Sequence, residues 1–213
     1  MQWSIATWSI KRCSKLRAGW KKDMLANFFA EQLLFIDETR RDGKSVRRRY
    51  GRCPKGCTPL ALSLPRRHSA HSILAMCSSA GVLEHFTVEG GFGADLFLAA
   101  FEELFARHIQ PFPAPNSVLV LDNCAIHHTH YDALAALVEG RGGILIFLPP
   151  YSPDFSPIEF MFGQFKKWLK RHIKEWDGLS FNVHTFIRRG FEESTSQLQA
   201  RHFYEKWGWQ FEF

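Results

Sequence analysis

Two uninterrupted apolar runs flanking one helical segment constrain the fold of this chain more than any other feature. The first run, SVLVLDN, covers residues 117–123, and the second, ILIFLPP, covers residues 144–150. Strands buried on both faces of a sheet have such continuous apolar runs, and central parallel strands are typical examples. The segment Tyr131–Glu139 between them has a helical pattern and ends at Gly140. Strand, helix and strand in this order predict a parallel unit of an α/β domain.

Shorter strand-like runs precede this unit. They are bounded by Gly, Pro and Ser, which predicts an antiparallel meander, and their sequences are LLFIDE, ALSLP, HSILAMCSS and VLEHFTVEG. Residues 92–108 change period, because apolar positions recur there at intervals of three and four, as in an amphipathic helix. Two further helices are expected, one after residue 156 and one over residues 182–198. We therefore predict an α/β domain over residues 31–213, with a mixed five-stranded sheet of antiparallel and parallel strands flanked by helices.

Three carboxylates stand at the ends of these elements. Asp37 ends the LLFIDE run and Asp122 ends the first long apolar run. Glu159 lies in the first turn of a helix that Ser156 caps and Pro157 begins. Such ends can meet at one edge of a sheet, where open α/β folds bind their ligands. Three carboxylates repel one another unless cations neutralise them, so we expect a site for hard divalent ions that suits phosphodiester chemistry.

Each acid has a competing interpretation. Glu159 stands three residues after Ser156, so the two could form a capping box instead, or in addition. Asp154 could replace Glu159 as the third acid, although an acid after Ser-Pro is also typical of a turn. Glu38 could replace Asp37, and because side chains alternate along a strand only one of these two neighbours can face the site.

The histidines and cysteines give weaker signals. A zinc cluster is one interpretation of four nearby residues, but their spacing does not fit a standard structural site: Cys124, His127, His128 and His130. Cys53 and Cys57 form a half-site without a second pair, so a Pro/Gly turn is the better interpretation. We expect His127 to contact phosphate or to steady the site, and Asn123 to orient Asp122 or to end the strand.

Charge favours a polyanionic partner. The net charge is +6 and the basic residues are clustered, with groups at residues 11–22, 47–52 and 166–171. A solvated charged face is the alternative for each group. The five cysteines lack the spacing of a disulfide framework, and no run has the composition of a signal peptide or the length of a membrane span. We therefore expect a protein with reduced thiols that is neither secreted nor in a membrane.

Four segments together resemble a known family: LLFIDE, RRRYGRCPKG, LVLDNCAIHH and LPPYSPDFSPIE. In combination they are similar to the catalytic domain of the mariner-type DDE transposases, which belong to the RNase H-like superfamily of transposases and integrases. The resemblance covers residues 31–175. It implies an RNase H-like fold in which Asp37, Asp122 and Glu159 are the catalytic acids and hold two divalent ions, Mg²⁺ or Mn²⁺.

The resemblance also implies an activity and partners. The activity would be DNA strand cleavage followed by strand transfer, with DNA in the form of transposon ends and target as the partner and a homodimer as one expected assembly. Side chains from the basic clusters and the site would contact DNA: Arg47, Arg48, Arg49, Arg52, His127, Lys166 and Lys170. We expect the nucleus as the location in a eukaryote, and the cytoplasm or nucleoid in a bacterium.

Two departures from the family pattern stand out. Glu159 follows Asp122 by 37 positions (159 − 122), slightly more than the family leads us to expect, and we assign the extra length to the loop at residues 140–143. Relatives also carry tandem helix-turn-helix modules, for which residues 1–30 are too short. We therefore interpret residues 1–30 as a basic helical linker or a remnant of such a module. The alternatives are therefore a truncated or domesticated copy that binds DNA without catalysis, and a nuclease without strand transfer.

Overall fold

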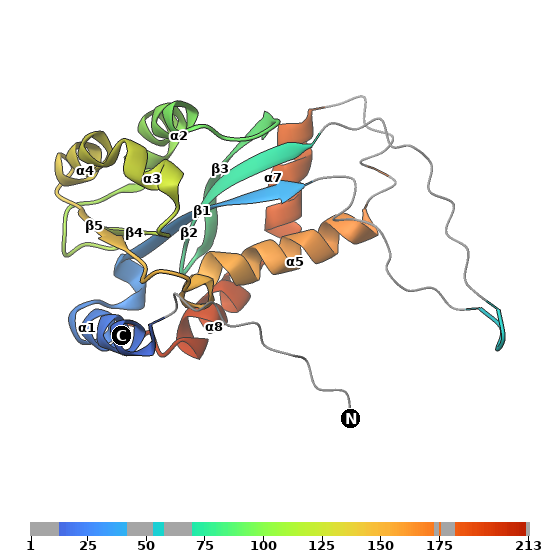
Figure 1. The fold of residues 1–213 in the computed structure, drawn as a ribbon, viewed down its shortest axis with the longest axis horizontal. Coiled ribbons are helices and arrows are strands. Elements are labelled where there is room, and N and C mark those ends of the chain that lie inside the picture. Colours follow the sequence, from blue (N-terminus) through green and yellow to red (C-terminus); the bar gives the residue numbers. More distant parts are fainter. Residues whose placement is uncertain (1–12, 42–52, 58–69, 173–174, 176–181, 212–213) are drawn as a thin grey trace.

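The structure of this protein is a computed structural model that describes residues 13–41, 53–57, 70–172, 175 and 182–211. Its centre is a five-stranded sheet with the order β3-β2-β1-β4-β5 (Figure 1). β1 pairs antiparallel with β2, and β2 with β3, whereas β1, β4 and β5 run parallel. The strands are β1 Leu33–Arg41, β2 His71–Ser78, β3 Gly81–Glu89, β4 Val118–Leu121 and β5 Ile144–Phe147. The predicted mixed sheet of a meander and parallel strands is confirmed.

Helices cover both faces of this sheet (Figure 1). The α-helices are α1 Ser14–Asn27, α2 Ala94–Ala100, α3 Ala125–Thr129, α4 Tyr131–Glu139, α5 Pro157–Arg171, α7 Val183–Ser194 and α8 Gln197–Lys206. Short turns complete them: η1 Ala30–Gln32, η2 Phe101–Phe105, η3 Ala106–His108 and η4 Pro153–Phe155. No helix in the described ranges is both long enough and apolar enough to cross a membrane.

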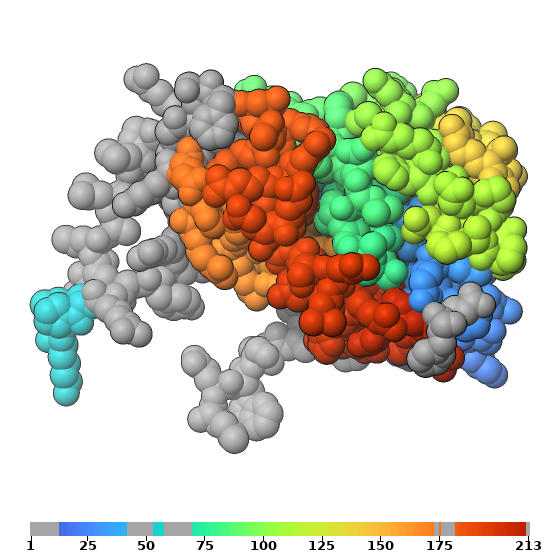
Figure 2. Space-filling model, turned by 180° about the vertical axis from the view of Figure 1, so that it is seen from behind, coloured from blue at the N-terminus to red at the C-terminus, as the bar shows by residue number. Residues whose placement is uncertain are grey.

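The side chains of β1 alternate between two separate cores. Leu33 and Phe35 face one core, to which α1, α5, α7 and α8 contribute, whereas Leu34 and Ile36 face the other, built with α2, η2 and α4. Figure 2 shows α7 and α8 lying across the back of the molecule beside β3. Burial on both faces explains why β1 and β4 have uninterrupted apolar runs. The layered α/β arrangement therefore follows directly from the sequence pattern.

Two local predictions differ in detail from the structure, and a third falls outside the described residues. The helix expected over residues 92–108 begins at Ala94, widens into a π-helical turn at η2 and ends in a 3-10 turn at η3. The helix expected over residues 182–198 is present as α7 but ends at Ser194, and Ser196 caps a second helix, α8, through a capping box with Gln199. The predicted ALSLP strand lies outside the described residues.

Candidate active site

The pairing of β1 with β4 places the first two acids next to each other. Ile36 pairs with Leu121 in the parallel register, so Asp37 and Asp122 are the next residues on the two neighbouring strands. Strand alternation gives Asp37 the same side as Phe35, which faces the core containing α5. The side chains of Asp37 and Asp122 therefore lie on the same side of the sheet, at the edge where α5 begins.

Glu159 joins them from the first turn of α5. The helix starts at Pro157 after Ser156, as the sequence predicts, and α5 packs against β1. Burial raises the pKa of Glu159, the charge of Lys166 lowers it, and the charge of Asp122 raises it again. The pKa of Glu159 thus responds to the second acid, so the helix brings its carboxylate within electrostatic range of the strand ends.

Asp37 has the most perturbed carboxylate of the three. Burial, followed by the negative charges of Asp122 and Glu159, raises its pKa from 3.8 to about 7, although the Glu38 backbone N–H donates a 2.6 Å hydrogen bond to Asp37 Oδ1. Like charges that share one site disfavour ionisation. The charges of Asp122 and Glu159 therefore both act on Asp37, and we refer to the three acids as the carboxylate cluster.

Asp122 is held in its ionised form by a buried histidine. Its Oδ1 accepts a hydrogen bond of 2.7 Å from Nδ1 of His127 and one of 3.2 Å from the backbone N–H of Cys124. Burial raises the pKa of Asp122, but these hydrogen bonds outweigh burial and hold the pKa below its usual range. Burial lowers the pKa of His127, but Asp122 and Cys124 raise it to about 10. The pair is therefore an imidazolium and a carboxylate at neutral pH.

His127 is not placed to touch a DNA backbone directly. Its side chain is 1% exposed, and its ring packs on Phe97 at a centroid distance of 4.6 Å. Its second nitrogen, Nε2, lies 3.9 Å from Oε1 of Glu38, and neither of these buried atoms has a hydrogen-bond partner among the described residues. Of the two expected roles for His127, the geometry fits steadying the site, while burial disfavours the phosphate contact.

Glu38 lies on the opposite side of β1 from Asp37. It follows Leu34 and Ile36, which face the core built with α2 and α4, and its pKa is raised by burial and lowered by the charge of His127. Alternation along β1 therefore separates the two neighbouring acids. Asp37 joins the carboxylate cluster, whereas Glu38 lies behind it, next to the histidine.

The competing interpretations of the third acid find no support in the geometry. The Ser156 side chain caps no backbone N–H of α5, so a capping box with Glu159 is not formed. Asp154 accepts two hydrogen bonds from the guanidinium of Arg17. Its carboxylate is therefore used in a contact with α1.

The histidines that follow Asp122 have separate partners. His128 hydrogen-bonds to Asn123 and stacks on Phe147, and His130 pairs with Asp95. Among the described residues, one group of three such side chains has its donor atoms within 4.8 Å of one another, namely Asp122, Cys124 and His127. The carboxylates of Asp37, Asp122 and Glu159 are spread more widely than this. The four-residue zinc cluster is not assembled. Cys53 and Cys57 are exposed free cysteines in a turn.

Asn123 has a structural role that the sequence only partly indicated. Its side-chain Nδ2 donates a hydrogen bond to the backbone oxygen of Leu148, while its Oδ1 accepts one of 2.8 Å from His128 Nε2. Leu148 directly follows β5 and begins the segment that leads to Glu159. Asn123 thus ties the strand that carries the second acid to the segment that carries the third.

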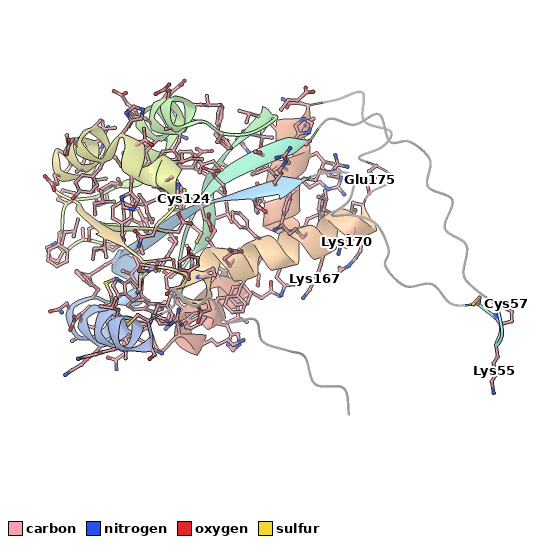
Figure 3. The ribbon with its side chains drawn as sticks, viewed as in Figure 1. Lys55, Cys57, Cys124, Lys167, Lys170 and Glu175 are labelled. Atoms are coloured by element: carbon pink, nitrogen blue, oxygen red, sulfur yellow. The ribbon has the colours of Figure 1, made fainter. Side chains whose placement is uncertain are left out.

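The basic residues expected to contact DNA are only partly within the described structure. Lys166 and Lys170 are exposed on α5, and Figure 3 shows Lys167 and Lys170 projecting from its outer surface, away from the sheet. The cluster Arg47, Arg48, Arg49 and Arg52 lies outside the described residues.

A cavity between β1 and α5, which the sequence did not indicate, is lined by Thr39, Arg40, Arg41, Ile73, Phe165, Lys166 and Leu169.

The strand order β3-β2-β1-β4-β5, with β1 antiparallel to β2 and parallel to β4, is the sheet of the RNase H-like fold. The profile of one family, described as "DDE superfamily endonuclease", matches residues 32–180, and the chain belongs to this family. No curated protein sequence matches the chain.

Solved structures share the fold at low sequence identity. The Mos1 strand transfer complex matches with 16% identity and a TM-score of 0.58, over 100% of this chain and 68% of that one. The Mos1 transposase paired-end complex with the left transposon end matches with 16% identity and a TM-score of 0.55, over the same shares of the two chains. An intasome of simian T-cell lymphotropic virus, in complex with a PP2A regulatory subunit, gives 11% identity and a TM-score of 0.51, over 83% of this chain and 56% of that one. The chain therefore has the fold of transposase and integrase catalytic domains.

Proposed function

We propose that this domain cleaves DNA strands and joins them to new positions, with Asp37, Asp122 and Glu159 as its catalytic acids. The observation that carries this proposal is the register of β1 and β4, which puts Asp37 and Asp122 at matching positions on neighbouring strands, together with α5, which packs on β1 and carries Glu159 in its first turn. Membership of the DDE endonuclease family supports the same assignment. Transposon ends and target DNA are the proposed substrates, in the nucleus of a eukaryote or the cytoplasm or nucleoid of a bacterium.

Asp37, Asp122 and Glu159 would hold two divalent ions, Mg²⁺ or Mn²⁺. All three groups offer carboxylate oxygens, which are the ligands that hard cations prefer. Burial, and then the negative charges of Asp122 and Glu159, raise the pKa of Asp37, so a bound cation would favour its ionised form. When bound, such ions activate a water or a 3′-hydroxyl and stabilise the charge of an in-line displacement at phosphorus.

The protein's own residues hold this cluster in place. His127 fixes the orientation of Asp122 through the 2.7 Å hydrogen bond, and Glu38 lies close to its other nitrogen. His127 is buried against Phe97, so it orients the carboxylate of Asp122 from within the protein.

The surface of α5 fits a DNA backbone next to the cluster. Lys166 and Lys170 are exposed on α5, the helix that carries Glu159 in its first turn. The positive charge of Lys166 lowers the pKa of Glu159. Lysines at such positions make phosphate contacts that position DNA without specifying its sequence. The net charge of +6 supports the same partner. A homodimer would allow two such domains to act on paired DNA ends.

A nicking and joining assay tests this proposal. Wild type and Asp122→Asn are incubated with supercoiled plasmid and a labelled duplex with a free 3′-hydroxyl, in Mn²⁺ and in EDTA. We expect nicked plasmid and labelled plasmid only with wild type and Mn²⁺. Nicking without joining would replace strand transfer with nuclease activity. Equal activity in both proteins, or none in either, would contradict the catalytic proposal.

A further inference from the structure

Helix α1 packs against the segment that leads to the third acid. We propose that Arg17 and Trp20 of α1 are positioning residues for Glu159, because they hold the η4 turn from which α5 begins. The inference rests on the proposed function and deepens it, since it gives the segment before the first strand a part in building the active site.

Arg17 contacts the η4 turn through both the charge and the planar face of its guanidinium. Its two terminal nitrogens donate hydrogen bonds of 2.9 and 2.5 Å to the two carboxylate oxygens of Asp154. The same guanidinium lies 4.1 Å from the centre of the Phe155 ring. The Arg17 side chain is 11% exposed, whereas that of Asp154 is 39% exposed, so the guanidinium is the more buried partner of the pair. A paired-oxygen contact of this kind fixes orientation as well as distance.

Trp20 holds both ends of the same segment. Its indole nitrogen donates a 3.0 Å hydrogen bond to the backbone oxygen of Phe147, the last residue of β5. Its ring stacks on Phe155 with centroids 5.5 Å apart and planes 12° apart. Trp207 and Trp209 from the C-terminal end complete the aromatic surroundings of Phe155 and Trp20. One helix thus spans the connection from the end of β5 to the η4 turn.

The η4 turn connects these contacts directly to the start of α5, where Glu159 lies. Phe155 is followed by Ser156 and then by Pro157, the first residue of α5. Proline has a fixed φ, so the connection has little freedom to absorb a displacement. Ser156 also donates its N–H to the oxygen of Pro153, which closes the turn just before the helix. A shift of Asp154 and Phe155 would therefore move the start of α5, where Glu159 lies.

Helix α1 itself depends on these contacts. No side chain among the described residues caps the N-terminus of α1, and the first turn of this helix contains no acidic residue to complement the helix dipole. A helix of 14 residues is marginal on its own in water. Met24 anchors the helix in the core shared with α5. The docking of α1 and the placement of the η4 turn are therefore mutually dependent.

A double-mutant cycle tests the inference. Arg17→Ala, Asp154→Ala and the double variant are compared with wild type, and Asp23→Asn, a change at an exposed position on the same helix, is the control. We measure the Mn²⁺ dependence of plasmid nicking and the hydrogen exchange of residues 153–161. Each single variant should raise the Mn²⁺ concentration for half-maximal rate and lower the maximal rate about tenfold, because small misplacements of catalytic groups are costly. The double variant should be no worse than either single one.

The outcomes separate this inference from the proposed function. Faster exchange at residues 153–161 with unchanged exchange in the central strands supports the positioning role. Wild-type-like exchange in Arg17→Ala, or losses that multiply in the double variant, would overturn it. An inactive wild type would instead count against the proposed function, and the exchange comparison would still decide whether Arg17 holds the turn.

Discussion

Asparagine in place of Asp37 should stabilise the metal-free protein at alkaline pH. The carboxylate of Asp37 is partly buried beside Asp122 and Glu159, so its ionised form is disfavoured in the folded state. Asparagine has nearly the same shape, and its side-chain oxygen can still accept the hydrogen bond from the Glu38 backbone N–H. The substitution therefore removes the charge while retaining the local geometry.

The magnitude follows from the pKa of Asp37, which rises from 3.8 to about 7 on folding. One pKa unit corresponds to about 1.4 kcal/mol, so ionised Asp37 lowers the free energy of unfolding by up to about 4 kcal/mol. Because the side chain keeps some exposure, we expect about 2–4 kcal/mol, or a rise in Tm of about 4–16 °C for a domain of this size.

The pH dependence has a definite sign. Below the unfolded pKa of 3.8 the carboxyl is protonated in both states, so the substitution has no electrostatic effect. As pH rises from there to about 7, the unfolded chain loses its proton first and the wild type loses stability. The gain from Asp37→Asn should therefore grow through this window and then level off.

Thermal unfolding in EDTA, followed by circular dichroism, measures this difference. Asp122→Asn is the matched comparison, and it should lower the Tm because it weakens the pair with His127, which holds the pKa of Asp122 down. Saturating Mn²⁺ should raise the Tm of wild type and not of Asp37→Asn. A metal-free Asp37→Asn protein that is no more stable than wild type at about pH 8 would refute the electrostatic argument.

Three further changes test other parts of the structure. Lys166→Ala should weaken DNA binding in a salt-dependent way, reducing the slope of log K against log salt by about 1 in fluorescence anisotropy titrations. Gly190→Ala should reduce the free energy of unfolding by about 1–3 kcal/mol in urea titrations, because its Cβ would lie 2.6 Å from Phe165 and 2.8 Å from Trp168. His85→Phe should reduce the loss of stability between pH 6.5 and 4, since burial lowers the pKa of His85 from 6.5 to about 4 and acid must protonate it on unfolding.

Matched controls make these predictions decisive. Gly163→Ala places its Cβ in open space and should leave stability unchanged or slightly higher. Lys22→Ala should leave the salt slope of DNA binding near the wild-type value. If a control variant had the same effect as the variant it is compared with, the contact assigned to the tested residue would be contradicted. If His85→Phe lost as much stability as wild type between pH 6.5 and 4, burial of a neutral His85 ring would be contradicted.

Much of this architecture is local information that a sequence carries. The apolar runs before Asp37 and Asp122 identify the central strands, and Pro157 marks the start of α5. Their meeting at one edge follows from the way parallel strands end on the same side of a sheet. The candidate acids could therefore be found without coordinates, because each is tied to the end of an element.

Other features depend on contacts between distant residues. Arg17 meets Asp154 across 137 positions, and no periodicity near either residue indicates the other. The N-terminal segment has the composition of a linker, but Met24 is buried in the core and Trp20 packs on Phe155. The burial of His127 likewise depends on Phe97 of α2, so its motif alone left a phosphate contact open.

Mn²⁺ binding to the metal-free protein tests the central claim most directly. The claim is that Asp37, Asp122 and Glu159 form one site for divalent cations. Electron paramagnetic resonance can count free Mn²⁺ in titrations of wild type, Asp122→Asn and Asp132→Asn, the last being an exposed acid on the neighbouring helix α4. We predict equal affinity for wild type and Asp132→Asn and affinity at least about tenfold weaker for Asp122→Asn. Equal binding by all three proteins would contradict the claim.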